Sequence, residues 1–142
     1  MILFGDAVHN FIDGLVMAAS FVVSINVGIA TSIAVISHEL PQELGNFGVL
    51  IYGGIERKKA LLYNFLAQLT SVAGGIIGFF LVAATGYAIY LLPFAAGGFI
   101  YISASDLIPE LHKQASMKKT MIAFLFFLLG IGFMIATKML FE

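Results

Sequence analysis

The chain has 142 residues, of which 61% are hydrophobic and only 11% are charged, and its mean hydropathy is +1.03. A soluble domain averages about 45–50% apolar and about 25% charged residues, so the composition excludes that class and indicates a membrane domain. The net charge of -1 and the lack of a basic stripe exclude a nucleic-acid-binding protein. Without cysteine, the chain has neither a disulfide framework nor a thiolate metal site.

Five stretches are long and apolar enough to cross a bilayer, which takes roughly 20 residues per helix. They lie at about 2–25, 28–53, 60–84, 87–110 and 119–140. The connections between them are too short for another domain, and the alternating pattern of a membrane β-barrel is missing. We therefore predict an all-α membrane protein in which residues 1–142 form a single transmembrane domain of five helices.

The basic residues predict the orientation of these helices. Six of the seven lie in two connections, at Arg57–Lys59 and at Lys113, Lys118 and Lys119. The other two connections carry no charge, so the positive-inside rule assigns both basic loops and the start of the chain to the cytoplasm. Lys138 is the exception, and its long side chain reaches the far interface from the end of the last span. The pattern predicts a multi-pass protein of the plasma or inner membrane.

The chain begins with Met1, and the apolar start of the first stretch follows at once, without the basic region or cleavage site of a signal peptide. It carries Asp6, His9, Asn10 and Asp13 within its first four turns. Because a helix this polar at its start inserts poorly on its own, we expect further spans to precede it.

The acidic residues, unlike the basic ones, lie in the spans. Six of the eight fall within or at the edges of the helices: Asp6, Asp13, Glu39, Glu43, Asp106 and Glu110. An ionised acid at mid-helix costs about 2.5–3.5 kcal/mol on insertion, and no deep Lys or Arg is present to neutralise these side chains. Protons and metal cations are therefore the candidate sources of positive charge.

The first two helices repeat one polar pattern. His9 and Asp13 stand four residues apart, as do His38 and Gln42, so each helix presents an imidazole and an oxygen ligand on one face. Further ligands flank these faces: Asn10, Glu39 and Glu43. Imidazole and oxygen ligands suit a divalent first-row metal such as zinc, iron or manganese, and they suffice here for two ions bridged by Asp13.

Pro41 lies inside this ligand group. It frees the carbonyl of Ser37 and bends the helix, a feature that membrane helices tolerate where they line polar cavities and transport sites. Further polar residues are candidates for a metal pathway: Asp6, Gln68, Asp106, Glu110 and His112. Simpler interpretations are an interface cluster beside Lys113 for the last three, and a packing hydrogen bond for Gln68, which shares a face with Asn64.

Two other functions use similar residues. His38-Glu39 begins like the zinc-protease motif H-E-x-x-H, but Gln42 replaces the second histidine and Pro41 disturbs the helical turn. An intramembrane metal-dependent hydrolase would have Glu43 as its only candidate general base. A proton-coupled carrier, or a structural bundle that binds no metal, is the second alternative.

The two ligand stretches, GDAVHNFIDG at 5–14 and HELPQELG at 38–45, resemble signatures of the ZIP (Zrt/Irt-like) family of divalent metal transporters, in the branch that includes the LIV-1 group. FAAGG at 94–98 and DLIPEL at 106–111 are similar to a later span of that family. The resemblance implies that the chain corresponds to spans four to eight of an eight-helix bundle. It also implies a transporter rather than an enzyme, with metal uptake into the cytosol by an elevator-like or rocking motion, and a homodimer.

The resemblance further implies two adjacent ion positions that share Asp13. One position uses His9, Asp13, His38 and Gln42, and the other uses Asn10, Asp13, Glu39 and Gln42. Gln42 stands where the LIV-1 signature has His, and a neutral amide is a poorer zinc ligand than imidazole. Zn2+ is the expected ion, with Fe2+, Mn2+ and Cd2+ as the other candidates, and no organic cofactor is expected. The pair Gly74 and Gly78 predicts close helix packing.

Overall fold

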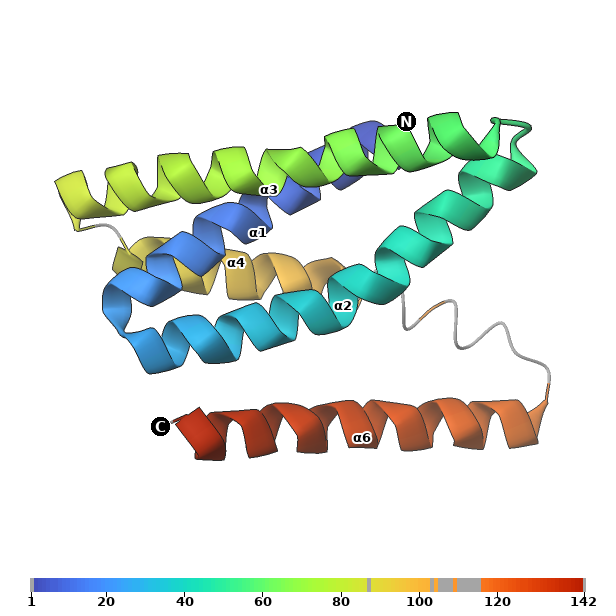
Figure 1. The fold of residues 1–142 in the computed structure, drawn as a ribbon. Coiled ribbons are helices and arrows are strands. Elements are labelled where there is room, and N and C mark those ends of the chain that lie inside the picture. Colours follow the sequence, from blue (N-terminus) through green and yellow to red (C-terminus); the bar gives the residue numbers. More distant parts are fainter. Residues whose placement is uncertain (1, 87, 103, 105–108, 110–115, 142) are drawn as a thin grey trace. The chain divides into compact units, whose positions relative to one another are not determined.

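The computed structural model describes residues 2–86, 88–102, 104, 109 and 116–141, and these residues contain helices and no strand (Figure 1). The helices are α1 (Ile2–Val23), α2 (Ile25–Tyr52), α3 (Arg57–Thr85), α4 (Ala88–Ile102) and α6 (Met117–Phe141). The predicted stretches coincide with these helices, except that the described part of the fourth ends at Ile102. The all-α fold class is therefore confirmed.

Three helices in the described part of the chain are long and apolar enough to cross a membrane: Ile2–Val23, Arg57–Thr85 and Met117–Leu140. Helix α2 has sufficient length, but the polar residues around His38 lower its hydropathy. Helix α4 has 15 residues, fewer than the roughly 20 that a bilayer requires. The count of five spans therefore stays a prediction.

The chain divides into two compact units, Met1–Leu92 and Pro93–Glu142. The first unit contains α1, α2, α3 and the start of α4, where Leu91 and Leu92 pack against buried Ala19 and Val82. The second unit contains the rest of α4 and α6. The predicted ligand residues of the first two helices all lie in the first unit.

A tight turn sets α1 and α2 side by side in opposite directions. Ser24 alone separates the two helices, with extended backbone angles, and its Oγ accepts a hydrogen bond of 3.1 Å from the N–H of Val27. A serine in this position satisfies one of the open N–H groups at the start of a helix. Because the turn is so short, the polar faces of α1 and α2 are brought to the same level.

Helices α1 and α3 make the most extensive contact in the first unit and run together along their length (Figure 1). Glycines allow this approach: a Cβ on Gly14 would overlap the carbonyl oxygen of Ser71, and one on Gly74 would overlap that of Phe11. Gly78 likewise lies against Leu15 of α1. The prediction that Gly74 and Gly78 permit close packing is confirmed.

The path of α2 differs from that of a straight helix. It continues through Pro41 and changes direction partway along its length (Figure 1). A proline inside a helix removes one backbone hydrogen bond and its ring displaces the preceding turn, so a bend is the expected result. After Tyr52 the chain turns back through Gly54, whose φ of 86° belongs to the left-handed region, and α3 begins at Arg57.

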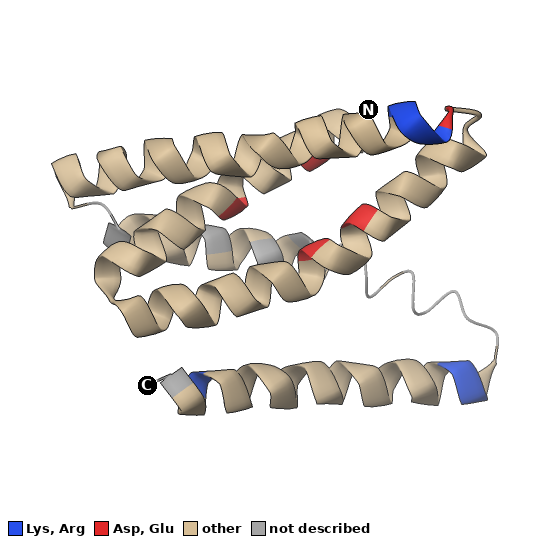
Figure 2. Ribbon diagram, viewed as in Figure 1, with Lys and Arg blue, Asp and Glu red and all other residues tan. Residues whose placement is uncertain are grey.

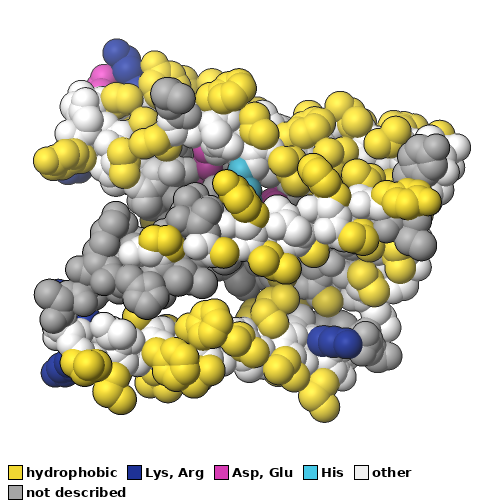
Figure 3. Space-filling view, turned by 180° about the vertical axis from the view of Figure 1, so that it is seen from behind, with side chains coloured by type: hydrophobic (Ala, Val, Ile, Leu, Met, Phe, Trp, Pro, Cys, Tyr) yellow, Lys and Arg dark blue, Asp and Glu magenta, His cyan; other side chains and the backbone are white. Residues whose placement is uncertain are grey.

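Many large hydrophobic side chains are exposed, as expected for helices that face lipid, and Figure 3 shows them on one face. In the middle of the face shown, a small patch of histidine and acidic atoms lies among them. Lys and Arg residues mark the start of α3 and the ends of α6, whereas Asp and Glu residues lie along α1 and α2 (Figure 2). Among the described residues, the basic residues thus lie at helix ends and the acids, apart from Glu56, lie along α1 and α2.

Candidate metal centre

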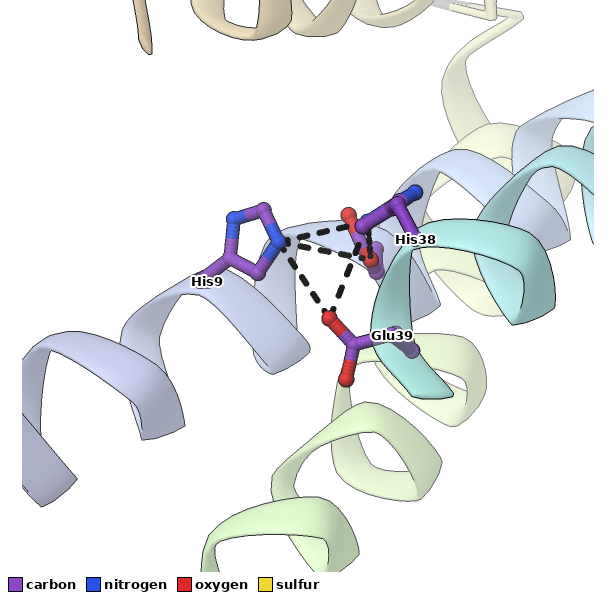
Figure 4. Close-up of side chains that lie close together, drawn as sticks. His9, His38 and Glu39 are labelled. Atoms are coloured by element: carbon purple, nitrogen blue, oxygen red, sulfur yellow. Dashed lines mark hydrogen bonds and ion pairs between the residues drawn. The ribbon is translucent and has the colours of Figure 1, made fainter. Parts of the chain in front are cut away.

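Four side chains of α1 and α2 converge on one small volume. They are His9 and Asp13 from α1 and His38 and Glu39 from α2, and one ligand atom from each lies within 4.8 Å of the others. Figure 4 shows His9, His38 and Glu39 pointing toward one another. The sequence pattern predicted that the imidazoles and carboxylates of these two helices meet, and they do.

Five of the six distances between the four ligand atoms are close to the edge length of a zinc tetrahedron. Ligand atoms about 2.0–2.1 Å from a tetrahedral zinc ion lie about 3.3–3.4 Å from one another. His9 Nε2 lies 3.3 Å from His38 Nε2, 3.3 Å from Glu39 Oε1 and 3.7 Å from Asp13 Oδ2. His38 Nε2 lies 3.0 Å from Asp13 Oδ2 and 3.6 Å from Glu39 Oε1. Five of the six distances among these atoms are thus close to those that a zinc ion needs, and the sixth, between Asp13 and Glu39, is at most 4.8 Å.

His38 is held in the form that a metal ligand needs. Its Nδ1 lies 3.0 Å from the carbonyl oxygen of Ala34, one turn earlier in α2. Because a carbonyl only accepts hydrogen bonds, Nδ1 carries a proton, and Nε2, which lies 3.0 Å from Asp13 Oδ2, is the nitrogen that would face a bound ion. A histidine that binds metal typically has its second nitrogen anchored in this way.

Asp13 is the most deeply placed ligand. Its relative exposure is 0%, and its Oδ1 has no hydrogen-bond partner among the described residues, while Oδ2 faces both histidines. A carboxylate oxygen that is buried and unpaired is unfavourable unless a cation or proton compensates it. One oxygen of Asp13 is thus engaged by the four-residue group and the other remains available, as a bridging ligand requires.

Helix α3 supports the acidic residues of α2. The amide nitrogen Nε2 of Gln68 donates to Glu39 Oε2 at 2.5 Å and to Glu43 Oε1 at 2.8 Å. Asn64, one turn away on the same face, donates to the backbone oxygen of Glu43 at 3.1 Å. Gln68, predicted as a residue that could reach the site, therefore holds the outer oxygen of Glu39 while Oε1 faces the histidines.

Gln42, which the resemblance assigned to both ion positions, makes a different contact in the structure. Its Nε2 donates to Oδ1 of Asp6 at 3.1 Å, and Asn46 donates to the same oxygen at 2.7 Å. The sequence reasoning did not single out Asn46, although it stands four residues after Gln42 on the same helical face. The role of Gln42 as a metal ligand stays a prediction.

The remaining predicted residues fall into two groups. Asn10 is fully buried, and neither its amide nitrogen nor its oxygen has a hydrogen-bond partner among the described residues. This leaves both groups available beside the acidic residues. The predicted pathway residues of the fourth span lie outside the described residues: Asp106, Glu110 and His112.

The hydrolase alternative depended on Glu43 as a free general base. In the structure, Glu43 Oε1 accepts a hydrogen bond from Gln68, and Glu43 is not one of the four residues that meet at the candidate centre. No observation on the described residues favours a metal-dependent hydrolase over a metal transporter.

Comparisons with known proteins find relatives that are named zinc transporters. Zinc transporter zipt-7.2 of Caenorhabditis elegans is 41% identical over 137 residues, which covers 93% of this chain and 30% of the relative. Zinc transporter foi of Drosophila melanogaster is 41% identical over 136 residues, which covers 95% of this chain and 19% of the relative. Zinc transporter ZIP10 of Danio rerio is 38% identical over 143 residues, which covers 95% of this chain and 17% of the relative.

The chain thus spans less than a third of the length of these relatives. No solved structure matches it significantly. The family model described as ZIP Zinc transporter matches residues 1–138, which is nearly the whole chain. On this match and on the relatives above, the protein is a membrane protein that belongs to the ZIP zinc transporter family.

Proposed function

We propose that the protein carries divalent metal ions, with zinc as the main cargo, across the membrane into the cytosol. The observation that carries this proposal is the convergence of His9, Asp13, His38 and Glu39 within 4.8 Å of one another, on helices that expose many apolar side chains. A site with two imidazoles and two carboxylates binds zinc well, and iron, manganese and cadmium are further candidate ions. The names of the relatives, all zinc transporters, support the same cargo.

Further features of the proposal rest on the sequence pattern. The basic loops face the cytoplasm, so the end of α1 that carries Asp6 is on the cytosolic side of the centre. The chain contributes five spans of a larger helix bundle in the plasma membrane and functions as a homodimer. Its expected partners are the divalent ion and the surrounding lipid bilayer.

Zinc uptake into proteoliposomes tests the proposal. Purified protein is reconstituted around a zinc-sensitive dye, and we expect zinc to enter faster than into protein-free liposomes. The double variant His9→Ala, Asp13→Ala removes two of the four ligands, so uptake should fall to the protein-free rate. The matched double variant Tyr52→Ala, Glu56→Ala changes residues outside the centre and should transport at the parental rate.

Equal uptake by the parent and the His9→Ala, Asp13→Ala variant would show that the site assignment is wrong. A proton flux that needs no added metal, with no zinc uptake, would support the proton-coupled carrier. Turnover of a peptide or lipid that stops on chelation would support the hydrolase.

Gln68 provides a test of how the centre is supported. Replacing it by Met keeps the side-chain length but removes the amide that donates to Glu39 and Glu43. Loss of an outer hydrogen bond of this kind typically lowers metal affinity about 10- to 100-fold, so we expect a corresponding rise in the zinc dissociation constant. Isothermal titration of zinc into the detergent-solubilised protein measures it.

The control for Gln68→Met is Asn64→Leu, on the same face of α3. Asn64 donates to a backbone oxygen and not to a carboxylate, so its loss should reduce stability without a comparable loss of affinity. Equal affinity losses in both variants would mean that packing of α3, rather than orientation of Glu39, is what matters.

A further inference from the structure

Asp6 is a buried carboxylate that the four-residue centre does not use. It is 5% exposed, and its Oδ2 is buried without a hydrogen-bond partner among the described residues. Its Oδ1 accepts from Gln42 at 3.1 Å and from Asn46 at 2.7 Å. Both donors are neutral amides, and no Lys or Arg lies in α1 or α2. No lysine or arginine of these two helices therefore compensates the charge of Asp6.

The two amides around Asp6 suit a site that alternates between an empty and a loaded state. An amide group has two N–H donors on one atom and an acceptor oxygen on the other. In the structure, Gln42 and Asn46 donate to the carboxylate. Rotation of each amide by half a turn presents its oxygen instead. The same three residues then offer one carboxylate and two carbonyl oxygens to a cation.

We propose that Asp6, Gln42 and Asn46 form a second, oxygen-only position for a divalent cation on the path away from the four-residue centre. This inference rests on the proposed transport function. Asp6 stands three residues before His9 and Gln42 four after His38, so the two positions are about one helical turn, or about 5.4 Å, apart. Gln42 belongs to the second position and lies one turn after His38 on the same face of α2.

The oxygen-only position should bind zinc more weakly than the four-residue centre, because it has no histidine ligand. Imidazole nitrogen binds zinc strongly, whereas carboxylate and carbonyl oxygens suit harder ions and hold zinc less tightly. An ion that leaves His9 and His38 for the oxygen-only position is therefore held weakly enough to move on. A buried carboxylate with an unpaired oxygen provides the attraction that brings the ion there.

Manganese electron paramagnetic resonance separates the two positions, because Mn2+ couples to directly bound nitrogen. The purified protein in lipid nanodiscs is titrated with Mn2+ alone. We expect two classes of bound ion, one with nitrogen couplings from the histidines and a weaker one without them. Asp6→Asn should remove the class without nitrogen couplings, or weaken it on the order of tenfold or more, and should keep the other.

The variant Asn46→Asp separates a cation position from a merely structural cluster. A second carboxylate raises the ligand charge, so a cation position should bind Mn2+ more tightly, by about tenfold. If Asp6 only serves as a hydrogen-bond acceptor, the same change places two acids together, removes a donor and destabilises the fold. This variant also decides the question if Asp6→Asn fails to fold.

Three results would overturn the inference. The first is that the parent binds no Mn2+ ion without nitrogen couplings, and the second is that Asp6→Asn retains that ion at parental affinity. The third is that Asn46→Asp binds the ion without nitrogen couplings no more tightly than the parent does. Zinc uptake into liposomes is measured in parallel. If uptake and the nitrogen-coupled class persist while the other class is absent, only this inference fails. If uptake and both classes are absent, the proposed transport function fails as well.

Discussion

Replacement of Asp13 by Asn is expected to abolish stabilisation by zinc while leaving the metal-free protein at least as stable as the parent. The two effects have opposite physical origins. Asn has nearly the shape of Asp, so packing at this fully buried position is retained, and the unpaired carboxylate oxygen is no longer charged. The metal loses an anionic ligand that lies 3.0 Å from His38 Nε2 and 3.7 Å from His9 Nε2.

Thermal unfolding in detergent, with and without zinc, measures both effects. A ligand at 100 times its dissociation constant stabilises a protein by about 2.7 kcal/mol, so the parent should show a clear rise in its unfolding midpoint. The Asp13→Asn variant should show no rise. The matched control is Glu56→Gln, an acid-to-amide change at the loop before α3, which should keep the full response to zinc.

A parental zinc response in Asp13→Asn would contradict the assignment of Asp13 as a ligand. A large loss of stability in the metal-free variant would instead indicate that the charge of Asp13 holds the two helices together through His9 and His38.

Replacement of Gly74 by Ala is expected to destabilise the packing of α1 against α3. The added Cβ would overlap the carbonyl oxygen of Phe11, which belongs to the backbone of α1 and cannot move aside as a side chain can. Overpacking of this kind costs about 1–3 kcal/mol or more. Because α1 carries His9 and Asp13, its displacement should also weaken zinc binding.

The neighbouring residue Gly75 provides the control for this prediction. A Cβ on Gly75 would lie 3.8 Å from the oxygen of Gly14, an ordinary contact. Alanine is favoured over glycine in a helix by about 1 kcal/mol, so Gly75→Ala should unfold at the parental temperature or above. If both variants unfold at the same temperature, the contact between α1 and α3 is looser than the structure indicates.

The residue types of the centre were predictable because the signals that identify them are local. Hydropathy marked the helices, and the four-residue spacing of His9 to Asp13 and of His38 to Gln42 placed ligands on one face of each. The short connection at Ser24 made the two helices neighbours in opposite directions. These features depend only on residues close together in the chain.

The partners of each ligand were not predictable in the same way. The family resemblance assigned Gln42 to the ion position of His9, Asp13 and His38 and Glu39 to the other; in the structure Glu39 lies with these three residues and Gln42 donates to Asp6. Which of two adjacent residues faces a neighbouring helix depends on how far each helix rotates about its own axis. In α2 that rotation is coupled to the bend at Pro41 and to the hydrogen bonds from α3, neither of which a local pattern encodes.

By itself, the sequence determined an all-helical membrane protein whose acids lie within the spans without basic partners, because composition and periodicity settle both points. Only the tertiary structure decided that Glu39 completes the four-residue centre, that Gln68 holds its outer oxygen, and that Gln42 and Asn46 engage Asp6. The physical reason is that these contacts join residues far apart in the chain. Close packing at the glycines of α1 and α3 places α3, which carries Gln68, beside the helix of His9 and Asp13.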